Sequence, residues 1–216
     1  MFTKYGYSTL GIISIITFIL ISTGFFVNNN FIKTILIILP VLLLLFSLYF
    51  FRDPDRVVPV KDNVVISPAD GKVLFVKDVL DNEYIKGKAK QISIFMSPLD
   101  VHVNRIPIDG VVDYLKYYKG DYIAAFEDKA SERNERAVFG IESKFGKVLF
   151  TQVAGFIARR IIYTLKIGDK VTIGKRFGMI KFGSRVDVVV PGKWEVKVKK
   201  EDKVLAGETI LFEYVE

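Results

Sequence analysis

Cysteine is absent from this 216-residue sequence, and histidine occurs once, as His102. Without cysteine the chain cannot form disulfides, thiolate nucleophiles, iron–sulfur clusters or thiolate zinc sites. A single imidazole also excludes a metal centre built from several histidines, so we expect no metal site. The chain also lacks the G-x-S-x-G pattern and the P-loop glycine pattern. Its chemistry must therefore come from hydroxyl, carboxyl, amine, guanidinium and amide groups and one imidazole.

Charge is nearly absent from the first fifty residues. Ser8–Val27 carries no charged side chain, and Phe31–Phe51 carries only Lys33. Each run is long enough to cross about 30 Å of hydrocarbon as a helix. A cleaved signal peptide is the alternative for the first run. A signal peptide has a shorter apolar segment, however, and it is not followed at once by a second span as the first run is here. The sequence therefore predicts a transmembrane helical hairpin over residues 1–51 and a separate domain over residues 52–216.

Basic residues flank the predicted hairpin on one side of the membrane. Lys4 precedes the first run, and Arg52, Arg56 and Lys61 follow the second. By the positive-inside rule both ends lie in the cytoplasm, which predicts a cell-membrane protein with a cytoplasmic domain. The net charge of +7 suits an anionic lipid surface. Nucleic acid is the competing explanation of a basic chain, but no compact Lys/Arg cluster with interleaved aromatics occurs, so we expect no nucleic-acid partner.

The remainder of the chain consists of short apolar runs bounded by Gly, Asp and Pro. Such runs predict a mainly β domain. One short helix is expected around Ala124–Arg133. The runs are Val64–Val76, Gln91–Ser97, Gly110–Tyr118, Arg136–Ser143, Lys147–Ala154, Arg160–Leu165 and Arg185–Val190.

One internal repeat occurs in this domain. Leu165–Gly174 reads LKIGDKVTIG and Val198–Gly207 reads VKKEDKVLAG. This rhythm resembles the strand–turn–strand unit of barrel-sandwich hybrids, the fold of lipoyl and biotinyl domains. Its glycines permit tight turns with positive φ. The predicted fold is therefore a barrel-sandwich-hybrid-like β domain that follows the helical hairpin.

Several polar residues in these runs could carry chemistry, and each also has a structural explanation. Asp70-Gly71 is a common turn dipeptide. His102 alternates with two valines and could simply be packed. Adjacent arginines on a strand face opposite ways, and a Gly-Ser pair is frequent in any chain. The candidates are Asp70, His102, Asn134-Glu135-Arg136, Arg159-Arg160 and Gly183-Ser184.

Taken in order, the segments around these residues indicate a function far more specifically than any single residue does. FFRDPDR, SPADGKV, MSPLDVHVNRIP, NERA, AGFIARRI and FGSRVD follow one another between Phe50 and about Val190. Their order and spacing closely resemble those of the short, prokaryotic-type phosphatidylserine decarboxylases. The resemblance implies a proenzyme that cleaves itself between Gly183 and Ser184. Chains 1–183 and 184–216 would stay associated, and Ser184 would become a covalent pyruvoyl cofactor.

The chemistry of such a cleavage can be stated from the residues. Ser184 Oγ would attack the carbonyl of Gly183, which requires a distorted backbone and donors for the oxyanion. Loss of CO2 from an amino acid then requires an electron sink, which a ketone provides. His102 has the one side chain with an ordinary pKa near neutrality, so it is the natural acid to protonate Cα.

The resemblance also implies roles for Asp70 and His102 in self-processing and decarboxylation, with one departure. The longer bacterial decarboxylases carry a second histidine three residues after the first, where this chain has Arg105. Either His102 serves both reactions, or Asp70 activates Ser184 directly or through water. The sequence leaves both possibilities open.

The implied substrate is a phospholipid in the membrane. The linker from Phe51 to Val64 is short, so the active site should lie close to the headgroup layer. Arg159 or Arg160 could bind the lipid phosphate or the substrate carboxylate, because a guanidinium matches either in a bidentate geometry.

Two other functions compete with this interpretation. A membrane-tethered, lipoyl-like adaptor without catalysis would explain the repeat and the hairpin, but not the ordered polar motifs. Archaetidylserine decarboxylase, which acts on an ether lipid, is not separated from the diacyl enzyme because the decarboxylated head group is the same. Oligomeric state also cannot be read from the sequence.

Overall fold

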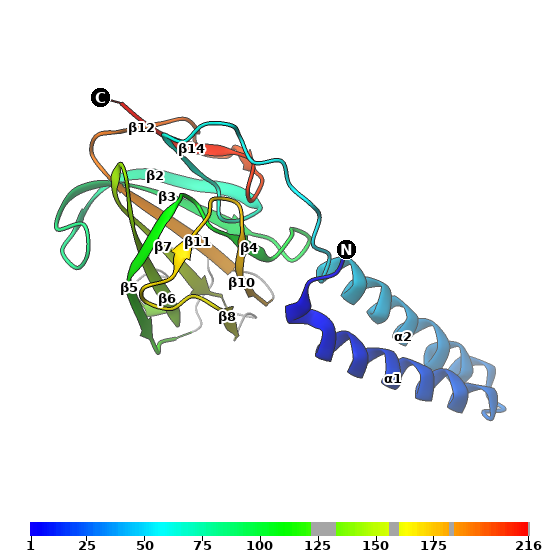
Figure 1. The fold of residues 1–216 in the computed structure, drawn as a ribbon. Helices are drawn as coiled ribbons and strands as arrows, with labels where there is room; N and C mark the ends of the chain where they lie inside the picture. Colours follow the sequence, from blue (N-terminus) through cyan, green and yellow to red (C-terminus); the bar gives the residue numbers. More distant parts are fainter. Residues whose placement is uncertain (122–132, 156–159, 182–183, 216) are drawn as a thin grey trace. The chain divides into compact units, whose positions relative to one another are not determined.

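The charge-poor N-terminal residues form the two helices of the first unit. The computed structural model describes residues 1–121, 133–155, 160–181 and 184–215, and it divides into two compact units, Met1–Asp55 and Arg56–Glu216. After a 3-10 turn at Lys4–Gly6, the first unit contains α1 (Tyr7–Phe25) and α2 (Asn30–Phe50) (Figure 1). The helix expected at Ala124–Arg133 falls mostly on residues 122–132, outside the described part of the chain.

The turn between α1 and α2 is stabilised by a cap and by close packing. The Asn29 side chain accepts hydrogen bonds from the amides of Phe31 and Ile32, which the first turn of α2 leaves without helical partners. At Gly24 of α1 a Cβ would lie 3.3 Å from Ile37 of α2, so a small residue lets the helices approach closely there. Both helices are long and apolar enough to cross a membrane. The prediction of two apolar helices before the β domain is confirmed.

The second unit is built from strands, as the short apolar runs predict. Among the described residues they form three sheets, with orders β1-β14-β12, β4-β10-β8 and β13-β2-β3-β11-β7-β6-β5-β9. The strands are β1 (Val64–Ile66), β2 (Gly71–Asp81), β3 (Gly87–Met96), β4 (Val103–Arg105), β5 (Gly110–Tyr118), β6 (Arg136–Ser143), β7 (Gly146–Ala154), β8 (Ile161–Tyr163), β9 (Lys170–Val171), β10 (Arg176–Ile180), β11 (Ser184–Pro191), β12 (Trp194–Val196), β13 (Lys203–Val204) and β14 (Ile210–Tyr214).

The eight-stranded sheet curls around the core, with β11 between β3 and β7 (Figure 1). Alternate residues of β11 face opposite ways, so Val186, Val188 and Val190 enter the main hydrophobic cluster. Burial of each such side chain contributes about 1.5–3 kcal/mol. Arg185 and Asp187, on the other face, form a buried ion pair with 2.7 Å between Nε and Oδ1. The predicted fold class, a mainly β domain after two helices, is confirmed.

The predicted internal repeat forms two equivalent turns at opposite edges of this sheet. In one copy the Asp169 carboxylate accepts the Lys166 amide at 2.8 Å, and in the other Asp202 accepts the Lys199 amide at 2.9 Å. Each copy then supplies a two-residue edge strand, β9 on β5 and β13 on β2. Glu201 has φ +77°, in the position of Gly168 at φ +92°. The repeat is therefore structural.

A second duplication accompanies the first. Pro68-Ala69-Asp70-Gly71 opens β2 and Pro107-Ile108-Asp109-Gly110 opens β5. Asp70 Oδ1 accepts the Ala206 amide at 2.8 Å, and Asp109 Oδ1 accepts the Ile173 amide at 2.6 Å. Each aspartate thus links one P-x-D-G segment to one copy of the repeat.

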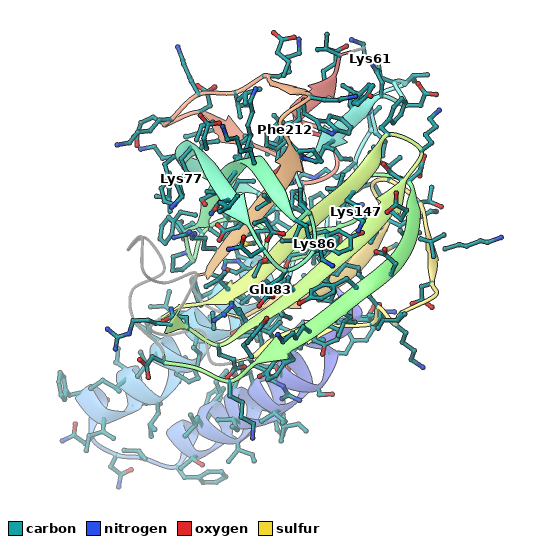
Figure 2. All side chains as sticks on the ribbon, turned by 90° about the vertical axis from the view of Figure 1, so that its left-hand side faces the viewer. Lys61, Lys77, Glu83, Lys86, Lys147 and Phe212 are labelled. Atoms are coloured by element: carbon teal, nitrogen blue, oxygen red, sulfur yellow. The ribbon has the colours of Figure 1, made fainter. Side chains whose placement is uncertain are left out.

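The outer face of the sheet is partly covered by the β2–β3 hairpin. Its tip carries Glu83 and Lys86, and Figure 2 shows them in front of the sheet. Glu83 accepts hydrogen bonds from the hydroxyls of Tyr114 and Tyr118 at 2.9 and 2.8 Å. Beneath the tip lies a second hydrophobic cluster formed by Tyr84, Ala89, Val138, Leu149 and Val189.

Candidate active site

Ser184 begins the central strand of the sheet. It pairs with Met96 of β3 on one side and with Ala154 of β7 on the other. Residues directly opposite one another share a face, so Ser184 points inward with the valines of β11. The side chain is completely buried, and its Oγ lies 3.3 Å from the sulfur of Met96. Gly183 lies outside the described residues.

The neighbouring small sheet brings His102 and Asn104 to the same inner region. Asn104 Nδ2 lies 3.8 Å from the Met96 sulfur, which Ser184 Oγ also contacts. His102 is two residues earlier and therefore on the same side of the extended segment. It is fully buried, and its backbone carbonyl accepts the Ile180 amide at 3.4 Å.

The contact of the His102 ring identifies its tautomer. Nδ1 lies 2.9 Å from the backbone oxygen of Asp100. A carbonyl oxygen only accepts, so Nδ1 carries the hydrogen in the neutral ring. Nε2 is then the nitrogen that can exchange a proton with a reacting group.

Asp70 lies on the segment whose backbone is hydrogen-bonded to the Asn104 side chain. The Pro68 carbonyl accepts from Asn104 Nδ2 at 3.3 Å, and two residues later the Asp70 side chain is 8% exposed. Arg56 Nη2 binds Asp70 Oδ2 at 2.7 Å, and the same guanidinium lies 3.4 Å from Glu208. Arg56, which the sequence predicts as a basic residue flanking the membrane hairpin, is therefore also the ion-pair partner of Asp70.

Burial raises the pKa of Asp70 above its ordinary value of 3.8, and the negative charge of Asp100 adds to the effect. The Ala206 amide and the Arg56 guanidinium act in the opposite direction without offsetting it. Asp70 is therefore a stronger base than an exposed carboxylate.

This shift predicts a pH dependence of stability. Above pH 3.8 the unfolded chain loses the proton that folded Asp70 keeps. The stabilisation is complete below that pH and is lost as the pH rises through the higher folded pKa. In a Ser184→Ala chain, which lacks the hydroxyl expected to cleave the backbone, Asp70→Asn should remove this decline. Thermal unfolding between about pH 3.5 and 7.5 measures it.

Asp109→Asn is the matched control, because it makes the same change at an exposed carboxylate that forms the equivalent turn contact. An identical pH profile for the Asp70→Asn and Asp109→Asn chains would contradict the assignment of the decline to the buried carboxylate.

Lys181 lies three residues before Ser184, and strand pairing places Arg160 next to Lys181. The Lys181 amide donates to the Arg160 carbonyl at 3.2 Å, which continues the pairing of β10 with β8. Burial lowers the pKa of Lys181, and the charge of Arg160 lowers it further. Such a pair favours an anionic ligand. Arg159 lies outside the described residues.

The other sequence candidates support the framework of the site. Asn134 is fully buried and donates to the Ala154 carbonyl at 2.7 Å, which fixes the strand beside Ser184. Arg105 Nη1 donates to the Gly174 carbonyl at 3.0 Å. Arg136 stacks on the Tyr118 ring at 4.1 Å and belongs to the outer face.

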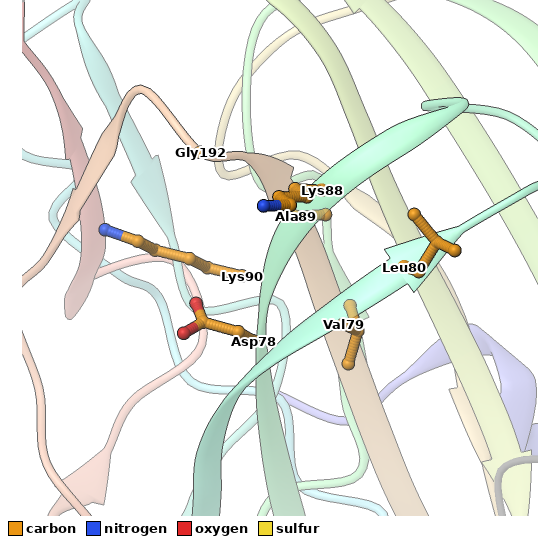
Figure 3. Close-up of a pocket in the computed structure, with 7 residues that line it drawn as sticks. All are labelled: Asp78, Val79, Leu80, Lys88, Ala89, Lys90 and Gly192. Carbon is orange, nitrogen blue, oxygen red and sulfur yellow. The ribbon is translucent and has the colours of Figure 1, made fainter.

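A surface cavity of about 590 Å³ lies elsewhere in the domain. Figure 3 shows Asp78 and Lys90 side by side at its wall. Lys90 is six residues from Met96 along β3, a span of about 20 Å in a strand. Lys90 Nζ also binds the Trp194 carbonyl at 3.0 Å. The cavity is therefore distant from Ser184.

Within the described ranges, no cluster of three or more His, Asp or Glu residues is arranged to hold a metal ion. The polar groups on the segments near Ser184 are instead the Asn104 amide and the His102 imidazole, and the Asp70–Arg56 ion pair lies farther away on the β2 side. This set is suited to proton transfer and to binding a small polar head group.

Sequence reasoning missed three of the polar residues in this region. Arg56 was interpreted only through the membrane, while Asn104 and Gln152 were not singled out. Gln152 is fully buried and donates to Asn104 Oδ1 at 2.8 Å. A detectable signal was present, because Gln152 is an uncharged polar residue within a strongly apolar strand.

The chain is similar to known proteins over almost its whole length. A family model described as phosphatidylserine decarboxylase matches residues 43–212. A phosphatidylserine decarboxylase proenzyme of Chlorobium limicola is 49% identical over 214 residues, covering 98% of this chain and 99% of the relative. Those of Pelodictyon phaeoclathratiforme (99% and 100% covered) and Salinibacter ruber (78% and 75% covered) are 45% and 50% identical.

Proposed function

Because the chain belongs to the phosphatidylserine decarboxylase family, we propose that it cleaves itself between Gly183 and Ser184 and then removes CO2 from phosphatidylserine. The observation that carries this proposal is the position of Ser184. It is the buried first residue of a strand that is paired on both sides, and its hydroxyl contacts the same Met96 sulfur as the Asn104 amide. The relatives carry the name proenzyme, which supports self-processing.

In the self-cleavage step, Ser184 Oγ attacks the carbonyl of Gly183 and loses its proton, and the C–N bond breaks as the acyl group moves to oxygen. Loss of the Ser184 α-proton then eliminates the ester, and water hydrolyses the resulting dehydroalanine to the pyruvoyl ketone and ammonia. We assign the base to Asp70, because burial raises its pKa and so its basicity. Gly71 lies against Phe95 on β3, and β3 separates β2 from β11. Asp70 and Ser184 are therefore separated by two strand spacings, or about 10 Å. The proton passes from Ser184 to Asp70 through an intervening group such as water.

The residues around Ser184 suit a pyruvoyl group at this position. Ala154 is small and Met96 is adaptable, so neither obstructs a planar ketone. Gln152 Oε1 is a buried acceptor without a donor among the described residues, and it can face the amine of a substrate. The pyruvoyl ketone supplies the electron sink that decarboxylation needs. His102 delivers the proton to the carbon that loses CO2.

The two products of cleavage would remain one folded unit. Residues 184–216 contain β11, β12, β13 and β14. β11 is paired with β3 and β7, β13 with β2, and β14 with β1. Cutting before Ser184 leaves all of these pairings intact, so the smaller chain stays bound through the core.

The substrate is proposed to enter from the cytoplasmic leaflet. α1 and α2 anchor the chain in the cell membrane, with the basic flanks on the cytoplasmic side. Arg160, together with Arg159, binds the phosphate or the carboxylate of the lipid. The same head group occurs on ether lipids, so archaetidylserine is an alternative substrate.

Mass spectrometry of the purified protein, followed by a lipid assay, tests this function. We expect two chains, 1–183 and 184–216, with a blocked first residue on the smaller one. Vesicles of phosphatidylserine should release CO2, and archaetidylserine vesicles measure the ether preference. An adaptor would remain one chain and release no CO2. An uncut chain that still decarboxylates would contradict the mechanism.

A further inference from the structure

Two buried amides from different sheets form a pair next to Ser184. Gln152 lies on β7 and Asn104 on β4, and neither is exposed to solvent. Gln152 Nε2 donates to Asn104 Oδ1 at 2.8 Å. Gly178 faces this pair, where a Cβ would lie 3.1 Å from Gln152 Nε2 and 2.3 Å from the Ile162 carbonyl. A glycine therefore leaves room for the amides.

The hydrogen bonds determine which way each amide points. Asn104 Nδ2 lies 3.3 Å from the Pro68 carbonyl and 3.8 Å from the Met96 sulfur, both of which are acceptors. Asn104 must therefore present its oxygen to Gln152, and Gln152 must present its nitrogen in return. Gln152 Oε1 then points elsewhere. It is buried and has no hydrogen-bond donor among the described residues.

Sheet register places this oxygen within reach of residue 184. Gln152 is directly opposite Val186, two residues along β11 from Ser184, so Gln152 and Ser184 share the inner face. Such diagonal neighbours are separated by about 7–8 Å. A glutamine side chain extends over much of that separation, which leaves space for one small polar group.

We infer that Gln152 is a substrate-binding residue, whose side-chain oxygen accepts a hydrogen bond from the amine nitrogen of the lipid head group, and that Asn104 positions it. This inference rests on the proposed function. The carboxylate and phosphodiester of phosphatidylserine are acceptors, so the amine is the head-group donor that can satisfy a buried acceptor. An uncharged amide also holds the amine without repelling the substrate carboxylate.

Binding of two lipids that differ in their amine tests this inference without turnover. Lysophosphatidylethanolamine carries an amine that can donate a hydrogen bond, whereas the quaternary nitrogen of lysophosphatidylcholine has no N–H, and neither lipid has a carboxylate to lose. Gln152→Met keeps the length of the side chain and removes the acceptor. We expect its dissociation constant for lysophosphatidylethanolamine to rise about tenfold, as for loss of one hydrogen bond to a charged group. Affinity for lysophosphatidylcholine and self-cleavage should be unchanged.

Gln91→Met is the matched control. Gln91 is a buried glutamine of the same sheet, but it faces the outer side, where its amide donates to Ser93 at 2.9 Å. This variant should bind both lipids as the wild type does. The double variant Gln152→Met with Asn104→Leu removes both members of the pair, so no buried Asn104 oxygen is left unpaired if the single variant folds poorly.

The outcomes separate this inference from the proposed function. An equal change for both lipids, or no change for either, would overturn the role of Gln152 while the wild type still cleaves and binds the amine lipid. A wild-type protein that stays uncut and does not bind lysophosphatidylethanolamine would overturn the proposed function and this inference with it.

Discussion

A Ser184→Ala chain should remain a single uncut polypeptide and release no CO2 from phosphatidylserine. Alanine keeps the inward position on β11 and removes the hydroxyl that attacks the preceding carbonyl. That oxygen leaves with the Gly183 carboxylate on elimination, and water then hydrolyses the remaining dehydroalanine to the ketone and ammonia. Without the hydroxyl neither step can occur, so one substitution abolishes both maturation and catalysis. Intact mass of the purified variant, compared with the wild type, measures the first loss. A CO2-release assay on phosphatidylserine vesicles measures the second.

Ser93→Ala is the matched control for this experiment. Ser93 is also a buried serine of the eight-stranded sheet, but it is paired with Asp187 and faces the outer side. This variant should be cut as completely as the wild type. If Ser184→Ala yielded two chains divided at the same peptide bond, the assignment of Ser184 as nucleophile would be wrong.

Replacement of His102 by asparagine should lower kcat by about 10²–10⁴, the usual contribution of a general acid. Asparagine can retain a donor near the Nδ1 position, where the Asp100 carbonyl accepts at 2.9 Å. It cannot deliver a proton from the Nε2 position. Because Asp70 is assigned to self-cleavage, the variant should still mature into two chains. Single-turnover decarboxylation by the purified, fully cut variant isolates the chemical step.

The same variant distinguishes the two divisions of labour that the sequence leaves open. An uncut His102→Asn chain would mean that the imidazole is needed for self-cleavage and that Asp70 alone is insufficient. A cut chain with undiminished kcat would remove His102 from catalysis altogether. Unfolding midpoints of the variant and the wild type indicate whether any loss comes from the fold instead.

Much of the fold could be predicted because it depends on local pattern. Apolar runs longer than a membrane core predict helices, and alternating runs bounded by turn residues predict strands. The repeat at Leu165–Gly174 and Val198–Gly207 predicted paired turns, and the aspartates of both copies form the same hydrogen bond. These features require only neighbouring residues along the chain.

The contacts of the candidate site could not be predicted in this way, because they join distant residues. Arg56 and Asp70 are 14 residues apart, Asn104 and Gln152 are 48 apart, and Asp70 and Ala206 are 136 apart. Which of these side chains meet depends on strand order and register. A shift of one residue in β7 would turn Gln152 from the inner face to the outer face.

By itself, the sequence determined the available chemistry: no thiols, one imidazole, an apolar hairpin, and an ordered set of motifs around Gly183-Ser184. The tertiary structure alone decided the environment of those groups. It buried Asp70 against Arg56 and placed a pair of amides beside Ser184. The physical reason is that composition and spacing are properties of the chain, whereas burial and hydrogen-bond partners exist only after the strands have paired.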